Sequence, residues 1–117
     1  MKIYIAGPMR GIPEFNFPSF FAAAEHLRRL GHTVFNPAER DNKYHGTDIS
    51  KGNLTGSEEV AASQHGFNLR DALAEDLWYI CKEADAIYLL NGWKNSKGAC
   101  AEKAAAEALK LKVMFQW

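Results

Sequence analysis

Short apolar runs alternate with longer helical patterns along this chain. The runs have the length of strands and lie at residues 3–6, 33–35, 86–90 and 113–115. Helices are predicted by apolar residues at helical spacing, and by a high alanine content in the last case, over residues 17–30, 69–84 and 99–109. Strands and helices in alternation favour a parallel sheet with helices on both of its faces.

The alternation predicts the α/β class, and the expected architecture within that class is more specific. We expect an α/β fold, a small flavodoxin-like or Rossmann-like three-layer sandwich whose four-stranded parallel sheet has the strand order 2-1-3-4, in a single domain over residues 1–117. Asn16 precedes Phe17-Pro18, and we expect its side chain to cap the first helix. Residues 38–67 are polar and weakly periodic, which predicts an irregular loop or lid over an active site.

The charge balance limits the classes of partner. Lys and Arg total 14, and Asp and Glu also total 14, so the net charge is zero and a nucleic acid polymer is not expected as partner. No apolar run approaches the roughly 20 residues that span a bilayer. The first residues form a strand rather than a signal peptide, so we expect a cytoplasmic protein without membrane contact.

Cysteine and histidine residues carry little chemistry in this chain. Cys81 and Cys100 do not make a disulfide framework, and we interpret both as small buried side chains. The four histidines are scattered and lack the spacing of metal ligands, so no metal site is expected.

Two carboxylates stand out from their local patterns. Asp76 falls on the apolar stripe of its predicted helix, which indicates either a functional group or a carboxylate that is solvated or paired for structural reasons. Glu102 lies about one turn into the alanine-rich helix, whose start borders the expected ligand crevice. Its alternative interpretation is an ordinary acidic residue in a first helical turn. Asp85, at the start of a strand, is interpreted as structural.

Two loops are expected to meet at the carboxyl ends of the strands, where ligands bind in such sheets. Residues 7–11 offer backbone amides and the cation of Arg10, while Ser96 and Gly98 offer a hydroxyl group and a close backbone. Together they could hold a phosphate, or they could be ordinary loop residues. Trp93 follows a strand end, where it could stack on a base or serve as packing.

These residues together resemble the nucleoside 2-deoxyribosyltransferase-like superfamily, and more closely its small phage and bacterial branch of unknown function, the DUF4406 type. The likeness covers nearly the whole chain outside residues 38–67. It rests on Tyr4-Ile5-Ala6-Gly7-Pro8-Met9-Arg10-Gly11 followed by Asn16, on Asp76 with Ala84-Asp85-Ala86 nine residues later, and on Leu90-Asn91-Gly92-Trp93 followed by Ser96-Lys97-Gly98-Ala99-Cys100-Ala101-Glu102.

The resemblance implies a catalytic role for three residues. Glu102, four residues after Gly98, matches the family's nucleophile. Tyr4, three residues before Gly7, matches the tyrosine that orients this glutamate. Asp76 matches the family's aspartate that contacts the leaving base and aids its protonation.

The resemblance also points to a phosphorylated substrate. Relatives that transfer deoxyribose between free nucleosides carry an Asp at the position of Ser96, whereas the branch that hydrolyses deoxynucleoside 5′-monophosphates has Ser there and an Arg at the position of Arg10. Ser and Arg would bind a 5′-phosphate that a carboxylate would repel. Pro8 departs from the hydroxyl residue of that branch and lacks an amide, which implies a different phosphate site.

The resemblance therefore implies an enzyme that cleaves the base–sugar bond of a (deoxy)nucleoside 5′-monophosphate, as an N-glycoside hydrolase or a 2-deoxyribosyltransferase. It would need no cofactor and would form a homodimer or a larger homo-oligomer. The competing interpretation is a protein that binds a nucleotide or a cyclic-nucleotide signal in the same pocket without cleaving it.

Overall fold

The fold is a parallel sheet covered by helices on both faces. The structure is a computed structural model that describes residues 1–9, 12–40 and 69–116. Its strands are β1 (Lys2–Ala6), β2 (Thr33–Phe35), β3 (Ala86–Leu89) and β4 (Lys112–Phe115), and they pair in the order β2-β1-β3-β4. The predicted α/β fold and the predicted strand order 2-1-3-4 are confirmed.

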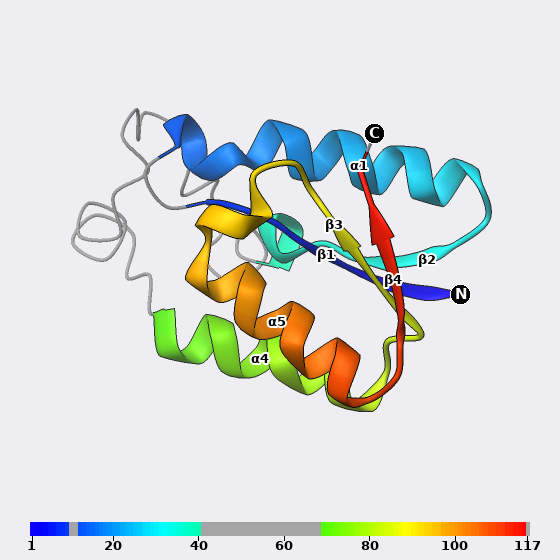
Figure 1. Cartoon of the computed structure of the whole chain (residues 1–117). Coiled ribbons are helices and arrows are strands. Elements are labelled where there is room, and N and C mark those ends of the chain that lie inside the picture. The colour runs from blue at the N-terminus through cyan, green and yellow to red at the C-terminus, as the bar shows by residue number, and fades with distance from the viewer. Residues whose placement is uncertain (10–11, 41–68, 117) are drawn as a thin grey trace.

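Three α-helices of the described residues form the outer layers of the sandwich. Helix α1 (Phe17–Arg29) lies on one face of the sheet, and α4 (Leu69–Lys82) lies beside α5 (Lys97–Ala108) on the other (Figure 1). Each joins two parallel strands, as the right-handed crossover between parallel strands requires. The carboxyl end of β1 therefore has helices on both sides, and a pocket opens there.

The position of β1 in the middle of the sheet explains why residues 3–6 are apolar without alternation. Ile3 and Ile5 pack in the core cluster under α1, while Tyr4 and Ala6 pack in the cluster under α4 and α5. Both faces of the strand are buried from Ile3 to Ala6, so the side chains there are mainly apolar. At the edge of the sheet, by contrast, the side chain of Phe115 on β4 is 54% exposed.

Asp85 has the structural role that its sequence position indicates. Its carboxylate accepts a hydrogen bond from the backbone N–H of Lys2 at 2.8 Å, and its own N–H donates to the Lys2 carbonyl at 2.7 Å. These two bonds set the start of β3 level with the start of β1. The two strands are then in register, with Ile3 opposite Ala86, and their carboxyl ends reach the same edge.

Several local predictions are wrong. Asn16 adopts a left-handed conformation (φ 60°) and makes no capping hydrogen bond; its side-chain amide instead donates to the Pro8 carbonyl at 3.1 Å. Asn16 therefore holds the loop after β1 rather than the first turn of α1. The side chain of Cys81 is exposed and that of Cys100 is partly exposed, because neither lies on the inner face of its helix.

The segment after β2 is also more regular at its start than expected. Residues 37–40 are helical, and the Asn36 side chain accepts the N–H of Ala38 at 2.9 Å. An asparagine before a proline thus begins this turn, as an N-cap does elsewhere. The rest of the predicted lid, residues 41–67, lies outside the described residues.

Candidate functional site

A pocket opens at the carboxyl end of β1, between α1 on one side and α4 and α5 on the other. We call it the edge pocket. It encloses about 690 Å³ of empty space, counted out to the solvent at its mouth. Its polar lining is contributed by Tyr4, Arg40, Asp76, Ser96 and Glu102. Its apolar lining is contributed mainly by Ile5, Met9, Phe15, Phe17, Phe20, Leu69 and Leu73.

The floor of the edge pocket holds a buried tyrosine–glutamate pair. Tyr4, on β1, is 1% exposed, and Glu102, on the second turn of α5, is 5% exposed. The Tyr4 hydroxyl donates a hydrogen bond of 2.6 Å to Oε2 of Glu102. The two residues are 98 positions apart, so the strand and the helix together fix the direction of the carboxylate.

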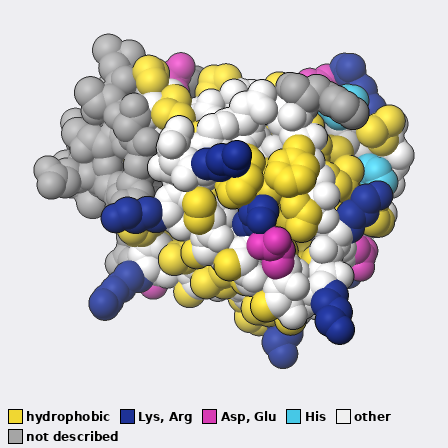
Figure 2. Space-filling view, viewed as in Figure 1, with side chains coloured by type: hydrophobic (Ala, Val, Ile, Leu, Met, Phe, Trp, Pro, Cys, Tyr) yellow, Lys and Arg dark blue, Asp and Glu magenta, His cyan; other side chains and the backbone are white. Residues whose placement is uncertain are grey.

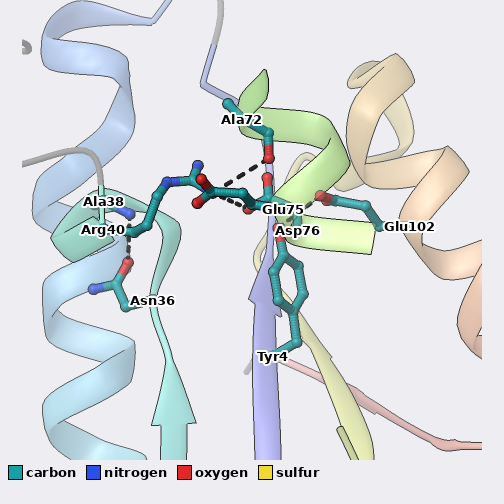
Figure 3. A network of polar contacts seen from close by, with 8 residues as sticks. All are labelled: Tyr4, Asn36, Ala38, Arg40, Ala72, Glu75, Asp76 and Glu102. Carbon is teal, nitrogen blue, oxygen red and sulfur yellow. Dashed lines mark hydrogen bonds and ion pairs between the residues drawn. The ribbon is translucent and has the colours of Figure 1, made fainter. Parts of the chain in front are cut away.

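Asp76 lies beside this pair and is held by a buried arginine. The residue is 8% exposed on α4, which excludes the solvated alternative for this carboxylate. Nη1 of Arg40 donates to Oδ1 of Asp76 at 2.7 Å and to the Ala72 carbonyl at 3.2 Å. Figure 3 shows Asp76 between Arg40 on one side and Glu102 on the other. Four separate segments therefore bring one cation, two carboxyl groups and a phenol together.

Burial changes the acid–base properties of Glu102. Its pKa is raised well above the ordinary value of 4.5, first because burial disfavours the charged form and second because the negative charge of Asp76 is close. A hydrogen bond with Asp76 raises this pKa further, while the Tyr4 hydroxyl and the charge of Arg40 lower it. Burial and the Glu102 charge also raise the pKa of Tyr4, so its phenol stays neutral and can donate.

The predicted phosphate loops lie at the same edge of the sheet. Gly7, Met9, Ser96 and Gly98 line the edge pocket. Gly7 is tightly packed, since a Cβ there would come within 2.7 Å of the Leu90 Cβ. A side chain at this position would force apart the loop after β1 and the end of β3.

A second, polar hollow adjoins the edge pocket and shares Ser96 with it. Pro8, Asn95, Ser96 and Lys97 line this hollow. The Ser96 hydroxyl oxygen caps α5 by accepting the N–H of Ala99 at 3.1 Å, which leaves its own hydrogen available as a donor. Lys97 contributes a cation at the rim.

Trp93 is placed differently from the other predicted residues. It lies in η2 (Trp93–Asn95) and packs near Phe115, with ring centroids 6.2 Å apart. The Lys103 ammonium lies 5.2 Å from the centroid of the Trp93 ring. Trp93 is not among the described residues that line the edge pocket. These contacts agree with the interpretation of Trp93 as a packing residue. Arg10 and Gly11 lie outside the described residues.

Sequence reasoning missed Arg40, because residues 38–67 were interpreted as one irregular loop. A usable signal was present: Arg40 follows Asn36-Pro37, a helix-start signature, directly after the second strand. That places it at the carboxyl edge, where the other site residues were expected. Phe17 and Phe20, predicted only as part of a helical apolar pattern, also line the edge pocket, together with Phe15.

The described residues form neither a metal-binding cluster nor a membrane-spanning helix. Within residues 1–9, 12–40 and 69–116, no group of three or more His, Cys, Asp or Glu side chains could hold a metal ion. Over the same part of the chain, no helix has both the length and the apolar character needed to cross a membrane.

Comparison with known proteins identifies the family but not an activity. Neither the curated proteins nor the solved structures contain a match to this chain. One family model matches over residues 1–115, and it is described as a domain of unknown function, DUF4406. Because this match spans nearly all of the 117 residues, the chain belongs to the DUF4406 family.

Proposed function

We propose that this protein cleaves the N-glycosidic bond of a (deoxy)nucleoside 5′-monophosphate, with Glu102 as the nucleophile. The observation that carries the proposal is the meeting of Tyr4, Asp76 and Glu102 in one buried pocket. These are the three residues to which the resemblance to nucleoside 2-deoxyribosyltransferase-like proteins assigns catalysis. Fold alone would not support an activity, but a matching constellation of side chains does.

The proposed chemistry divides the work between the two carboxyl groups. Glu102 attacks the anomeric carbon as the base departs, through a transition state with oxocarbenium character, and forms a glycosyl-enzyme. Asp76 assists protonation of the leaving base. Tyr4 orients the Glu102 carboxyl group through its hydrogen bond. Water then releases the sugar phosphate, or a second base accepts the sugar in a transferase reaction.

The apolar wall of the edge pocket suits a nucleobase. Phe15, Phe17 and Phe20 line it together with Leu73 of α4. A planar base against these side chains would be removed from water and could stack on an aromatic ring. Its ring nitrogens would then lie on the side of the pocket that carries Asp76.

The polar hollow suits the 5′-phosphate of the same substrate. Its Ser96 hydroxyl and Lys97 ammonium are donors that a phosphate accepts, and it adjoins the edge pocket through Ser96. Figure 2 shows Lys and Arg side chains scattered over the displayed face rather than gathered in one stripe. Such a surface favours a small phosphorylated molecule over a nucleic acid polymer.

One observation favours a second candidate function. The raised pKa of Glu102 makes the neutral carboxyl group more abundant than in an ordinary glutamate, and a neutral carboxyl group is a poor nucleophile. The pocket could therefore bind a nucleotide, or a cyclic-nucleotide signal, and keep it intact. The two candidates differ only in whether the glycosidic bond breaks.

The test is release of free base. Purified protein is incubated with a panel of ribo- and deoxyribonucleoside 5′-monophosphates, and free base is followed by chromatography. Glu102→Ala is compared with Glu107→Ala, which removes a largely exposed glutamate paired with Lys103 on the same helix. We expect release by the parent protein and by Glu107→Ala but not by Glu102→Ala.

Thermal unfolding in the presence of each nucleotide separates the two candidates. A ligand at 100 times its Kd stabilises the folded state by about 2.7 kcal/mol, which is easily measured. Stabilisation without base release would refute the enzyme and support the binding protein. The absence of both would refute the nucleotide pocket altogether.

A further inference from the structure

Among the residues that the structure describes, the buried cluster at the floor of the edge pocket has two acidic groups and one cation in direct contact with one of them. Arg40 contributes one positive charge, and Asp76 and Glu102 contribute two carboxyl groups. All three side chains are largely buried: the Arg40 and Asp76 side chains are 8% and 11% exposed, and Glu102 is 5% exposed. With both carboxyl groups ionised the cluster would carry a net negative charge in a poorly solvated place, which is costly. One bound proton makes it neutral.

The contact between the two carboxyl groups also calls for a proton. Asp76 and Glu102 line the same pocket, and the negative charge of Asp76 raises the pKa of Glu102. Ionised carboxylates are acceptors only, so a hydrogen bond between two of them exists only when one carries a hydrogen. A single proton held by the pair would remove the repulsion between them and allow such a hydrogen bond, as at other sites where two carboxyl groups meet.

The surrounding side chains decide which of the two carboxyl groups holds that proton. The Arg40 guanidinium donates directly to Asp76 at 2.7 Å and is also bound to the Ala72 carbonyl, so it faces Asp76. Glu102 receives from β1 only a neutral donor, the Tyr4 hydroxyl at 2.6 Å. Glu75, 46% exposed, lies 3.4 Å from the same Arg40 nitrogen and belongs to the rim. A direct ion pair stabilises a carboxylate more strongly than a neutral hydrogen bond does.

We propose that Arg40 is a positioning residue that keeps Asp76 ionised and thereby leaves on Glu102 the proton that the two carboxyl groups share. The Arg40 guanidinium acts on Asp76, and Asp76 in turn accepts the hydrogen of Glu102. The resting site is then a neutral triad of arginine, carboxylate and carboxylic acid, and the Tyr4 hydroxyl donates to the Glu102 carboxyl group (Figure 3).

This arrangement supplies the proton that glycosidic cleavage needs, a consequence that rests on the proposed function. As the C–N bond breaks, its electron pair goes to the base nitrogen. The proton passes from Glu102 to Asp76 and on to that nitrogen, while the Glu102 carboxylate forms the new bond to the anomeric carbon. When water later cleaves this ester bond, its hydroxyl goes to the sugar and its proton returns to Glu102. The proton inventory of the site is the same after one turnover as before it.

The test is a titration of individual carboxyl groups in the whole protein. Carboxyl ¹³C shifts are followed by NMR from pH 5 to 9 in uniformly labelled protein, with Glu102→Gln and Asp76→Asn used to assign the two signals. At pH 7 we expect the shift of a neutral acid for Glu102 and that of a carboxylate for Asp76. If the parent protein at pH 7 gave the shift of a carboxylate for Glu102, or that of a neutral acid for Asp76, the proposal would be overturned without any variant.

Variants of Arg40 test its part in this arrangement. Arg40→Met should move the titration of Asp76 to higher pH and move the shared proton from Glu102 toward Asp76, and Arg40→Lys should reverse much of this. Arg28→Met, which removes an arginine from an exposed pair with Glu39, is the matched control and should change neither signal. Unchanged titrations in Arg40→Met would overturn the proposal. If that variant does not fold, Arg40→Gln, which also lacks the positive charge, is judged by the same criterion.

Kinetics provide a separate readout once base release has been observed. The singly protonated pair is the active form, so the pH profile of kcat/KM should be bell-shaped, and Arg40→Met should move both limbs to higher pH. We expect kcat to fall by about 10²-fold, the scale of a lost general acid, with a smaller change in KM. An Arg40→Met profile that coincides with that of the parent would refute the role of Arg40. The NMR titration needs no turnover, so a protein without the proposed activity can still confirm or refute the role of Arg40.

Discussion

Replacing Glu102 by Gln should stabilise this protein at neutral pH. Glu102 is 5% exposed, and burial together with the charge of Asp76 raises its pKa well above 4.5. Glutamine has the shape of the neutral acid. Its amide can accept the Tyr4 hydroxyl and donate to Asp76, but it never acquires a charge. The substitution therefore removes the cost of keeping a proton on Glu102 at a pH where the unfolded chain has lost it, and it keeps the contacts.

The sign of the pH dependence follows from proton binding. Below the ordinary pKa of 4.5, the folded and the unfolded chain both hold the Glu102 proton, and the two proteins differ little. Above it the unfolded chain loses this proton first, so the free energy of unfolding of the parent falls as pH rises. The maximal slope for one proton is about 1.4 kcal/mol per pH unit. The loss levels off once the folded protein also ionises.

This slope corresponds to a measurable change in melting temperature. With an unfolding entropy of about 2.1 cal/mol/K per residue for 117 residues, 1.4 kcal/mol shifts Tm by about 5–6 °C. The assay is urea denaturation and calorimetry at pH 5, 6, 7 and 8, with Glu107→Gln as the exposed control on the same helix. We expect the advantage of Glu102→Gln over the parent to grow with pH. A constant difference across this range would show that Glu102 has an ordinary pKa and would refute the reasoning.

Two further predictions concern the floor and the mouth of the edge pocket. Tyr4→Phe removes the hydroxyl that lowers the pKa of Glu102, so the pH-dependent loss of stability should extend to higher pH. The substitution also leaves Oε2 of Glu102 buried without its donor. Urea denaturation at pH 7 should therefore show a loss of about 1–3 kcal/mol in the free energy of unfolding. An unchanged pH dependence would contradict this. Gly7→Ala places a Cβ 2.7 Å from the Leu90 Cβ and should destabilise the protein by about 1–3 kcal/mol. In Gly98→Ala the nearest atom to the new Cβ is 3.9 Å away, and alanine is favoured over glycine in a helical turn by about 0.5–1 kcal/mol. Thermal melts that rank these two alanine variants in the opposite order would refute the packing at the loop after β1.

Local patterns of residues were sufficient to predict the fold of this protein. The apolar runs at 3–6 and 86–90 lack alternation because both faces of β1 and β3 are buried, and this property is visible in composition alone. Alternation with helices then implies parallel strands and a common carboxyl edge. Asp76 was predictable as an exception on its own helix because a carboxylate breaks an apolar stripe.

Pairing across the chain was decided only by the tertiary structure. Asp76 meets Arg40 across 36 positions, and Tyr4 meets Glu102 across 98, distances over which no local periodicity carries information. The direction of a side chain at a loop is equally non-local. Trp93 packs near Phe115 because β4 lies there, and the Asn16 amide bonds to Pro8 because the left-handed backbone before α1 turns it toward that loop.

Residue type and position in the chain therefore indicated which groups could carry chemistry. The tertiary structure determined their charge state, because the pKa of a carboxyl group depends on its burial and on the charges within a few ångströms of it. Nothing in the local sequence sets Glu102 apart from other helical glutamates, and its pKa is raised only because the tertiary structure buries it close to the charge of Asp76.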